Sequence, residues 1–298
     1  MRVLVVCNPI SGGGRAGRLG PELRELLTSE GHEVELVRTG RAGDARERAA
    51  RVDLEFDRIV VVGGDGTVNE VVNGLREPAR IPLTQLATGT ANLLAHDLRL
   101  PYSVREMGRL MGNGSIRRLD LGLVSCAGTP AGQRRFLMVT SVGFDAMVTL
   151  EAQGQRRGPM SYARWLPSIV RVAHSYRPPR LRVEVDDGQP VEGQMVIVSN
   201  VRNYGGLFTA ADRASCDSGH LDVCVLTRAA LPALARAAWS ALRGGLSRSR
   251  GVVYLTGERI RVSSDGPVPV EIDGDPGGTT PIEISVRPRV VPVVVPGH

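Results

Sequence analysis

A short apolar run that ends in a glycine-bearing loop and is followed at once by a helical pattern occurs three times in the N-terminal third of the chain. The runs are VLVVC, RIVVV and PLTQLA, and the loops contain Gly12–Gly17, Gly63–Gly66 and Gly89. Strands that alternate with helices in this way build a mostly parallel sheet with helices on both faces, and such sheets bind ligands at the carboxyl ends of their strands. The pattern predicts an α/β domain with a ligand site at these loops.

The pattern of polar and apolar residues changes near residue 121. Residues 122–298 contain strands with alternating polarity, such as RLRVEVDD and RIRVSS, separated by Gly, Asp and Pro turns. Such alternation predicts antiparallel pairing. We therefore expect an α/β domain over residues 1–121 and a mainly antiparallel β-sandwich domain over residues 122–298, with the last run, VVPVVVP, able to return to the first domain. A chain of 298 residues that is 42% hydrophobic can supply both cores.

Two helical patterns interrupt the β-rich region. LPALARAAWSALRGGL places five apolar residues on one stripe and predicts an amphipathic helix; they are Leu231, Leu234, Ala238, Trp239 and Leu242. Such a stripe usually packs in a core, which is the favoured interpretation, and docking on a membrane surface is the alternative. SYARWLPSIVRVAHSY is similar, but Pro167 is expected to break it.

Charge and composition restrict the partners and the compartment. A net charge of +6 favours nucleotides, anionic membranes or nucleic acid, but with 4% aromatic residues a nucleic-acid partner is not expected. The four cysteines form no CxxC pair, which predicts reduced thiols in the cytoplasm and neither a zinc site nor a disulfide framework. No apolar run approaches the roughly 18 residues of a membrane span, so any membrane contact is expected to be peripheral.

The first loop matches two familiar motifs incompletely. Gly12, Gly14 and Gly17 satisfy the dinucleotide fingerprint GxGxxG, but the second strand, EVELVRT, ends without the acidic residue that holds the ribose of NAD. A phosphate-binding P-loop requires Lys after the last glycine, and Arg18 stands there. A tight turn that only packs the helix on the strand is the remaining alternative.

The second and third loops indicate phosphate binding. Glycines let the backbone approach phosphate oxygens, and a helix N-terminus contributes free N–H groups. Asp65 beside phosphates suggests Mg²⁺-assisted phosphoryl transfer, while simple capping of the helix is the alternative. Thr90 in the third loop is a candidate for phosphate binding or helix capping. Three such loops together predict a nucleotide cleft.

The chain resembles the diacylglycerol kinase catalytic-domain family, specifically the soluble bacterial lipid kinases related to sphingosine kinases and, more distantly, to NAD kinases. The resemblance spans nearly the whole chain and rests on NPISGGGRA, TGRAGDA, GGDGTVNEVVNGL, GTANLLA, RRLDLG, SVGFDAMV, VSNVRNYGG, SGHLDV and EIDGDP. It implies a cytoplasmic enzyme of phospholipid metabolism that uses Mg²⁺ to transfer the γ-phosphate of ATP to a lipid hydroxyl, such as that of diacylglycerol, at the inner membrane face.

The resemblance also implies which residues bind ATP and catalyse the transfer. The ATP-binding positions that match the family are Asn8, Pro9, Ser11, Gly12, Gly13, Thr39, Gly64, Asp65, Gly66, Thr67, Asn69, Glu70 and Thr90. The catalytic base of the family lies in a DGE element that matches Asp273-Gly274-Asp275, so either Asp273 or Asp275 is the implied base, with Asp65 close to the phosphates. From the residues alone, IDGDPGG predicts a hairpin turn.

Metal binding is implied at two further places. Asp120 in RRLDLG matches a family aspartate that joins a carboxylate, water and Mg²⁺ network. Many relatives hold a structural Mg²⁺ with a DDG element, where this chain has Asp217-Ser218-Gly219. Ser218 therefore stands at the ligand position, and Asp217 substitutes for it after a shift of one residue.

Several functions stay open from the sequence. A NAD-kinase-like phosphotransferase shares the GGDGT loop, although VSNVRNYGG and IDGDP favour the lipid kinases. A catalytically impaired nucleotide-binding protein is the second alternative, because Asp275 is one methylene shorter than the Glu of the family. The acceptor lipid is not identified, and a homodimer is neither indicated nor excluded.

Overall fold

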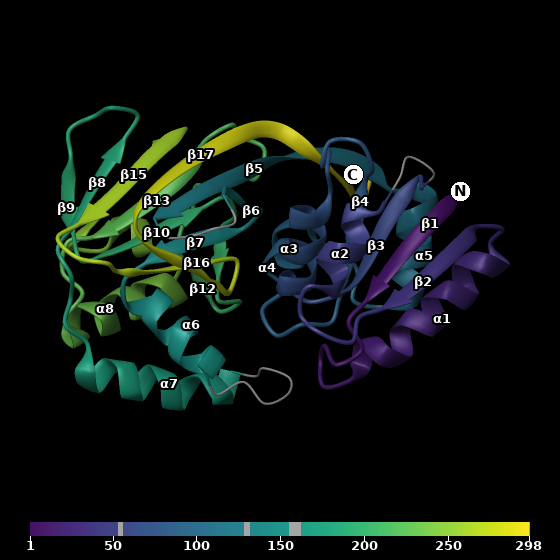
Figure 1. Ribbon diagram of the computed structural model, residues 1–298, viewed down its shortest axis with the longest axis horizontal. Helices are drawn as coiled ribbons and strands as arrows, with labels where there is room; N and C mark the ends of the chain where they lie inside the picture. The colour runs from purple at the N-terminus through teal and green to yellow at the C-terminus, as the bar shows by residue number, and fades with distance from the viewer. Residues whose placement is uncertain (53–55, 128–131, 155–161, 298) are drawn as a thin grey trace. The chain divides into compact units, whose positions relative to one another are not determined.

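The computed structural model describes residues 1–52, 56–127, 132–154 and 162–297 (Figure 1). The chain forms two compact units, one made of Met1–Leu119 with Arg289–His298 and the other of Asp120–Pro288. Two long strands pass from one unit to the other: β5 (Ser115–Ala127) and β17 (Asp275–Val295). The N-terminal unit is therefore completed by the C-terminal end of the chain.

The N-terminal unit is built on a parallel sheet. Its strands are β1 (Arg2–Cys7), β2 (Glu33–Arg38), β3 (Arg58–Gly63) and β4 (Leu83–Ala87). They lie in the order β4, β3, β1, β2, and the end of β17 adds a parallel strand beside β4, where Val293 pairs with Leu83. The last apolar run of the sequence thus belongs to this sheet.

Both faces of this sheet are buried. Val3, Val5, Val60 and Val62 pack in one core with residues of α1 (Arg15–Ser29) and α5 (Val104–Asn113). The alternate residues Leu4, Val6, Ile59 and Val61 have no solvent exposure either. The remaining helices are α2 (Asp44–Ala50), α3 (Asp65–Gly74) and α4 (Leu93–Leu98). Strands buried on both faces explain the continuous apolar runs, and the predicted α/β fold is confirmed.

The C-terminal unit is antiparallel, as expected. One series of paired strands is β14 (Val252–Gly257), β13 (Leu221–Leu226), β10 (Met195–Ser199), β7 (Val139–Val142), β16 (Pro269–Ile272) and β17. The other runs through β9 (Val191–Gly193), β8 (Leu181–Val185), β15 (Arg259–Ser264), β17, β5 and β6 (Arg134–Phe136). Their apolar side chains form one core that includes Phe136, Val196, Val223, Ile260 and Ile282.

Helices and short elements complete the C-terminal unit. They are α6 (Phe144–Gly154), α7 (Tyr162–Ser175), α8 (Leu231–Leu242), the short 3₁₀ helix Leu246–Arg248 and the hairpin of β11 (Asn203–Tyr204) with β12 (Phe208–Thr209). The expectation that Pro167 breaks its helix is wrong, because α7 runs through this residue. In the part of the chain that the structure describes, no helix is both long and apolar enough to cross a membrane.

The interpretation of α8 as a core helix is also wrong. Ala237 and Ala241 are its buried residues, whereas Leu231, Trp239 and Leu242 are 50%, 59% and 52% exposed. The helix rests on the unit with its smallest side chains and directs its largest ones outward. Periodicity alone could not tell which face of the helix is covered.

Candidate active site

The first glycine loop, residues 8–14, leads from β1 into α1 with three consecutive glycines in the left-handed region. Their φ values are 61° for Gly12, 66° for Gly13 and 94° for Gly14, which is a conformation that costs other residues about 1–2 kcal/mol. At Gly12 a Cβ atom would also lie 2.2 Å from the carbonyl oxygen of Thr88. This glycine is therefore required both by its backbone angle and by the close approach of the third loop.

All three glycine loops meet at one edge of the parallel sheet. The Asn8 amide donates to Thr67 Oγ1 at 3.3 Å, and Thr88 Oγ1 donates to Ser11 Oγ at 3.0 Å. A Cβ atom on Gly89 would lie 2.6 Å from Gly64 Cα, so these two backbones touch. The structure thus brings together the loops that the sequence singled out, with the N-termini of α1 and α3 beside them.

Asp65 links the second loop to the third. It is the first residue of α3, and its Oδ2 accepts a hydrogen bond from the backbone N–H of Leu93, the first residue of α4, at 3.0 Å. The N-cap residue of α3 is Gly64, which as a glycine offers no side chain to the helix N-terminus. The partly buried carboxylate therefore lies among the loops that would hold phosphates.

Several of the implied ATP-binding residues have structural roles in this unit. The Glu70 carboxylate accepts hydrogen bonds from the backbone N–H groups of Gly43 and Ala45 at 3.0 and 3.2 Å, at the start of α2. Asn69 is 4% exposed and accepts from the Asn73 amide at 3.1 Å. Thr39 follows β2, and its N–H donates to the Cys7 carbonyl. Thr90, Gly66, Pro9 and Gly13 are at least partly exposed around the loops.

The Asp273-Gly274-Asp275 element is the predicted hairpin turn, between β16 and β17. Ile272 pairs with Asp275, and the two residues between them have φ values of 48° and 87°, as a type I′ turn requires. The Asp273 carboxylate is 5% exposed and accepts from three consecutive backbone N–H groups, those of Leu137, Met138 and Val139, at 3.0, 3.1 and 2.9 Å. Asp275 is partly buried at the start of β17. The two aspartates therefore have different surroundings.

A pair of buried carboxyl groups beside this turn was missed by the sequence analysis. Ser141 Oγ lies 2.8 Å from Asp145 Oδ2 and 3.1 Å from Glu271 Oε2, and the Gly274 N–H donates to Glu271. A hydroxyl has one proton to donate, so the second contact forms a hydrogen bond only when that carboxyl is protonated. The sequence signal was an acidic residue inside an apolar strand, PVEI.

Burial explains the titration of this pair. Desolvation raises the pKa of Glu271 well above its ordinary value, and the neighbouring Asp145 raises it further. Desolvation also raises the pKa of Asp145, against the lowering effect of its hydrogen bonds. The pKa of the Tyr204 hydroxyl is raised by burial and by both carboxyl groups. One of the two carboxyls is therefore expected to keep its proton where an exposed one would lose it.

The implied metal ligands meet in a turn of the C-terminal unit. Asp120 is fully buried, and its Oδ2 accepts from the Gly219 N–H at 2.6 Å. The Ser218 hydroxyl donates to the His220 carbonyl and accepts from the His220 N–H, and Asp217 Oδ1 accepts from the Ser215 hydroxyl at 2.6 Å. The Ser218 oxygen is thus used within its own turn and fits a metal poorly. Among the described residues no group of three or more His, Cys, Asp or Glu side chains is arranged to hold a metal ion.

Comparison with known proteins finds two family models along the chain. Residues 2–124 match the model of the diacylglycerol kinase catalytic domain, and residues 138–295 match that of the YegS C-terminal NAD kinase beta sandwich-like domain. The chain belongs to the diacylglycerol kinase catalytic-domain family. It is thus a member of a kinase family, which implies ATP as the co-substrate.

Individual relatives align with nearly the whole of this chain. The diacylglycerol kinase of Bacillus subtilis (strain 168) is 28% identical over 300 residues, covering 99% of this chain and 96% of the relative. The diacylglycerol kinase of Staphylococcus carnosus (strain TM300) is 26% identical, covering 94% and 90%. A crystal structure of a diacylglycerol kinase from Bacillus anthracis strain Sterne superposes with a TM-score of 0.73 at 19% identity, covering 99% of this chain and 96% of that one, and supports the fold.

Proposed function

We propose that this protein is an ATP-dependent lipid kinase that transfers the γ-phosphoryl group of ATP to a lipid hydroxyl, such as that of diacylglycerol. The observation that carries the proposal is the meeting of three glycine loops through the Asn8–Thr67, Ser11–Thr88 and Gly64–Gly89 contacts. Such loops leave backbone N–H groups and helix N-termini for phosphate oxygens. The relatives named above support a diacylglycerol-type acceptor.

Phosphoryl transfer depends mainly on positioning and on charge neutralisation. Residues 8–14 and the start of α3 would hold the phosphate groups by their backbone, and Asp65 would stand beside them. Mg²⁺ bound to the ATP phosphates would neutralise their charge, and the carboxylate of Asp65 is the donor in these loops that suits this cation. The Asn8 and Ser11 side chains keep the loops in register around the nucleotide.

Asp275 is the catalytic base that we propose. Asp273 is engaged as the acceptor of three backbone N–H groups, and protonating it would weaken those bonds, whereas Asp275 is less buried and lies at the start of β17. The acceptor hydroxyl oxygen would attack the γ-phosphorus as the bond to the β–γ bridging oxygen breaks. Its proton would pass to the Asp275 carboxylate, and ADP would leave.

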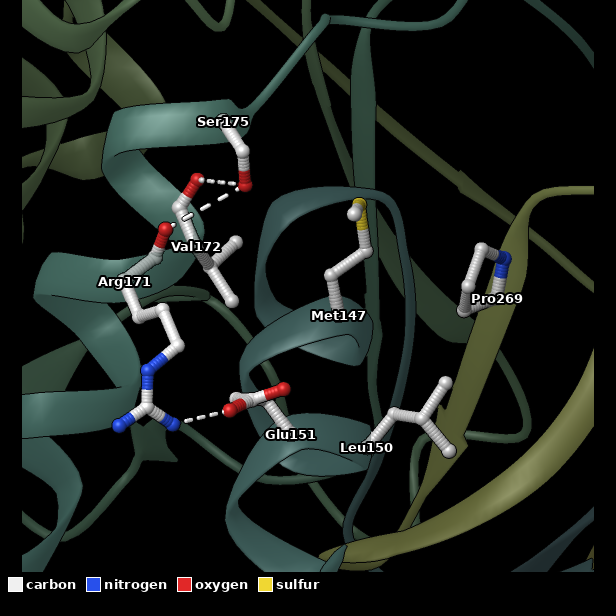
Figure 2. A pocket seen from close by; sticks show the side chains of 7 residues that line it. All are labelled: Met147, Leu150, Glu151, Arg171, Val172, Ser175 and Pro269. Atoms are coloured by element: carbon white, nitrogen blue, oxygen red, sulfur yellow. Dashed lines mark hydrogen bonds and ion pairs between the residues drawn. The ribbon is translucent and has the colours of Figure 1, made fainter.

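A cavity of about 280 Å³ in the C-terminal unit is our candidate for part of the acceptor lipid (Figure 2). Met147, Leu150, Val172 and Pro269 give it apolar walls, and the ion pair of Arg171 with Glu151 lies at its α6–α7 side. Pro269 begins β16, the four-residue strand that ends at the Asp273 turn. That strand spans about 13 Å, a distance that a lipid chain can bridge.

The proposal is tested by incubating the purified protein with γ-labelled ATP, Mg²⁺ and micelles that contain diacylglycerol or another lipid alcohol. A separate assay replaces the micelles with NAD. Asp275→Asn is expected to lower kcat by about 10²–10⁴-fold, because a positioned base contributes that much. Asp65→Asn is expected to lower kcat/KM for ATP. The matched control is Asp265→Asn, which changes an exposed aspartate that, like Asp65, directly precedes a glycine.

Comparing Asp273→Asn with Asp275→Asn tests whether Asp273 is the structural aspartate and Asp275 the catalytic one. Asp273→Asn should lower the free energy of unfolding by about 2–3 kcal/mol, because an amide cannot accept all three N–H groups. Asp275→Asn should lower this free energy by less than Asp273→Asn does, because Asp275 is less buried than Asp273. Labelling of NAD alone would show a NAD-kinase-like enzyme, and ATP binding without any transfer would show a nucleotide-binding protein.

A further inference from the structure

The outer face of α8, defined here as Leu231, Ala235, Trp239 and Leu242, is apolar and exposed in the part of the chain that the structure describes. These residues follow one another at intervals of three or four, so they form one stripe along the helix. Their side chains are exposed, and Leu231, Trp239 and Leu242 each keep at least half of their surface in solvent. Exposed apolar surface of this kind marks an interaction site.

Basic groups border this face, and acidic ones are missing from the surrounding sequence. Arg236 and Arg243 are exposed and directly follow Ala235 and Leu242 in the sequence. The Arg243 guanidinium lies 4.6 Å from the centre of the Trp239 ring. Residues 223–257 contain no Asp or Glu but five arginines: Arg228, Arg236, Arg243, Arg248 and Arg250. Arg248 forms an ion pair with Asp212, which lies outside this segment.

The combination fits one class of partner. A helix with an apolar stripe and basic flanks lies in the plane of a membrane interface, with the stripe about 5–10 Å deep. Tryptophan favours that depth, and arginine can keep its charge among the headgroups. We propose that the outer face of α8 docks the protein on an anionic phospholipid surface. This inference rests on the proposed lipid kinase function and adds the surface by which the enzyme reaches its substrate.

Vesicle flotation measures the docking directly. The probes are vesicles of phosphatidylcholine and vesicles of an equal mixture of phosphatidylcholine and phosphatidylglycerol. Wild-type protein should bind the mixed vesicles and lose binding as salt is raised. Trp239→Ser should lower the partition coefficient by at least about tenfold, because the variant lacks the apolar ring that membrane binding removes from water. Arg243→Gln should lower the partition coefficient by about fivefold, because it removes one charge that is attracted to anionic headgroups.

Matched substitutions control for general surface effects. Arg24→Gln removes an exposed charge from α1, and Ile116→Ser removes an apolar side chain that is 53% exposed in β5. Both should keep wild-type partition. The chain has two tryptophans, so in a Trp165→Phe background the fluorescence reports on Trp239, and it should shift to the blue when mixed vesicles are added.

The outcomes separate docking from catalysis. The α8 variants should phosphorylate a water-soluble short-chain diacylglycerol at the wild-type rate while losing activity on vesicles. If no lipid is phosphorylated but wild-type protein still floats through α8, the kinase proposal fails and the docking proposal stands. Wild-type partition of Trp239→Ser and Arg243→Gln would overturn the docking proposal. So would a change from dimer to monomer in these variants with vesicle binding unchanged, which would make the face a protein interface.

Discussion

At the scale of single residues, hydrogen bonds to the acidic side chains Asp273 and Glu271 hold the hairpin turn of the C-terminal unit in place. Asp273 accepts from three backbone N–H groups and orders residues 137–139 against the hairpin turn. Glu271 accepts from Gly274 in the same turn and shares Ser141 with Asp145. The turn that carries Asp275 is therefore held by two buried carboxyl groups. In our proposal their roles are architectural, although the sequence places them in or next to the catalytic motif.

The buried carboxyl pair predicts a particular pH dependence of stability. Because the folded-state pKa of Glu271 is raised above its unfolded value, folding takes up a proton. The stabilisation is fully present below the unfolded pKa, and it is lost as the pH rises through the folded-state pKa. Between about pH 5 and pH 8 the free energy of unfolding should fall more steeply in wild type than in Glu271→Gln.

Chemical denaturation at a series of pH values measures this difference. Glu22→Gln, which changes an exposed glutamate of α1, is the control and should keep the wild-type slope. Parallel curves for wild type and Glu271→Gln would contradict the assignment of a shared proton to the pair.

At the scale of secondary-structure elements, the loop between β1 and α1 is shaped by the loop that follows β4. Gly12 and Gly13 have nearly the same φ, 61° and 66°, but a Cβ atom on Gly12 would lie 2.2 Å from the Thr88 carbonyl oxygen, whereas one on Gly13 would have no neighbour within 4 Å. The two positions thus share a backbone requirement and differ in contact.

Alanine substitution at these two glycines separates the requirements. Gly13→Ala should lower the free energy of unfolding by about 1–2 kcal/mol, the cost of the left-handed conformation. Gly12→Ala should cost at least about 2 kcal/mol more, because the loop must also move away from Thr88. Urea denaturation of both variants measures this, and calorimetric titration with ATP shows whether the displaced loop still binds the nucleotide. Equal costs would mean that the two loops do not touch in solution.

At the scale of the whole molecule, the N-terminal unit depends on the last ten residues of the chain. Val291, Val293 and Val294 have no exposed surface, and the Val294 carbonyl accepts from Thr84 Oγ1 at 3.0 Å. Burying one valine contributes about 1.5–3 kcal/mol, so three of them amount to a large part of a typical domain stability of about 5–15 kcal/mol. The sheet that carries the glycine loops is therefore completed by residues that lie far away in the sequence.

Removal of residues 289–298 should unfold the N-terminal unit and abolish ATP binding. A chain that ends at Pro296 is the control, because Pro296 and Gly297 are exposed, and it should match wild type. Circular dichroism on heating and calorimetric titration with ATP give the two readouts. A truncated protein with the wild-type melting temperature would show that the sheet is stable without its C-terminal strand.

Much of the fold and of the candidate site could be predicted from local sequence. Apolar runs of strand length, glycine loops and Asp-Gly turns act within a few residues, so they determined the parallel sheet, the antiparallel unit and the hairpin at Asp273, all of which the structure has. The same glycine pattern made the loops around Gly12, Asp65 and Thr90 candidates for phosphate binding, and the resemblance to the family added ATP. Their assignment to ATP stays a prediction.

Only the tertiary structure decided which side of each element is covered and which acidic groups share one environment. Periodicity gives α8 an apolar stripe, but whether another element packs on Trp239 depends on chain segments far away in sequence. Likewise, Ser141, Asp145 and Glu271 meet because β7 and β16 pair across 130 residues, and the distance of Gly12 from Thr88 depends on how two loops close on one sheet edge. These are long-range packing relations, and nothing in a local pattern determines them.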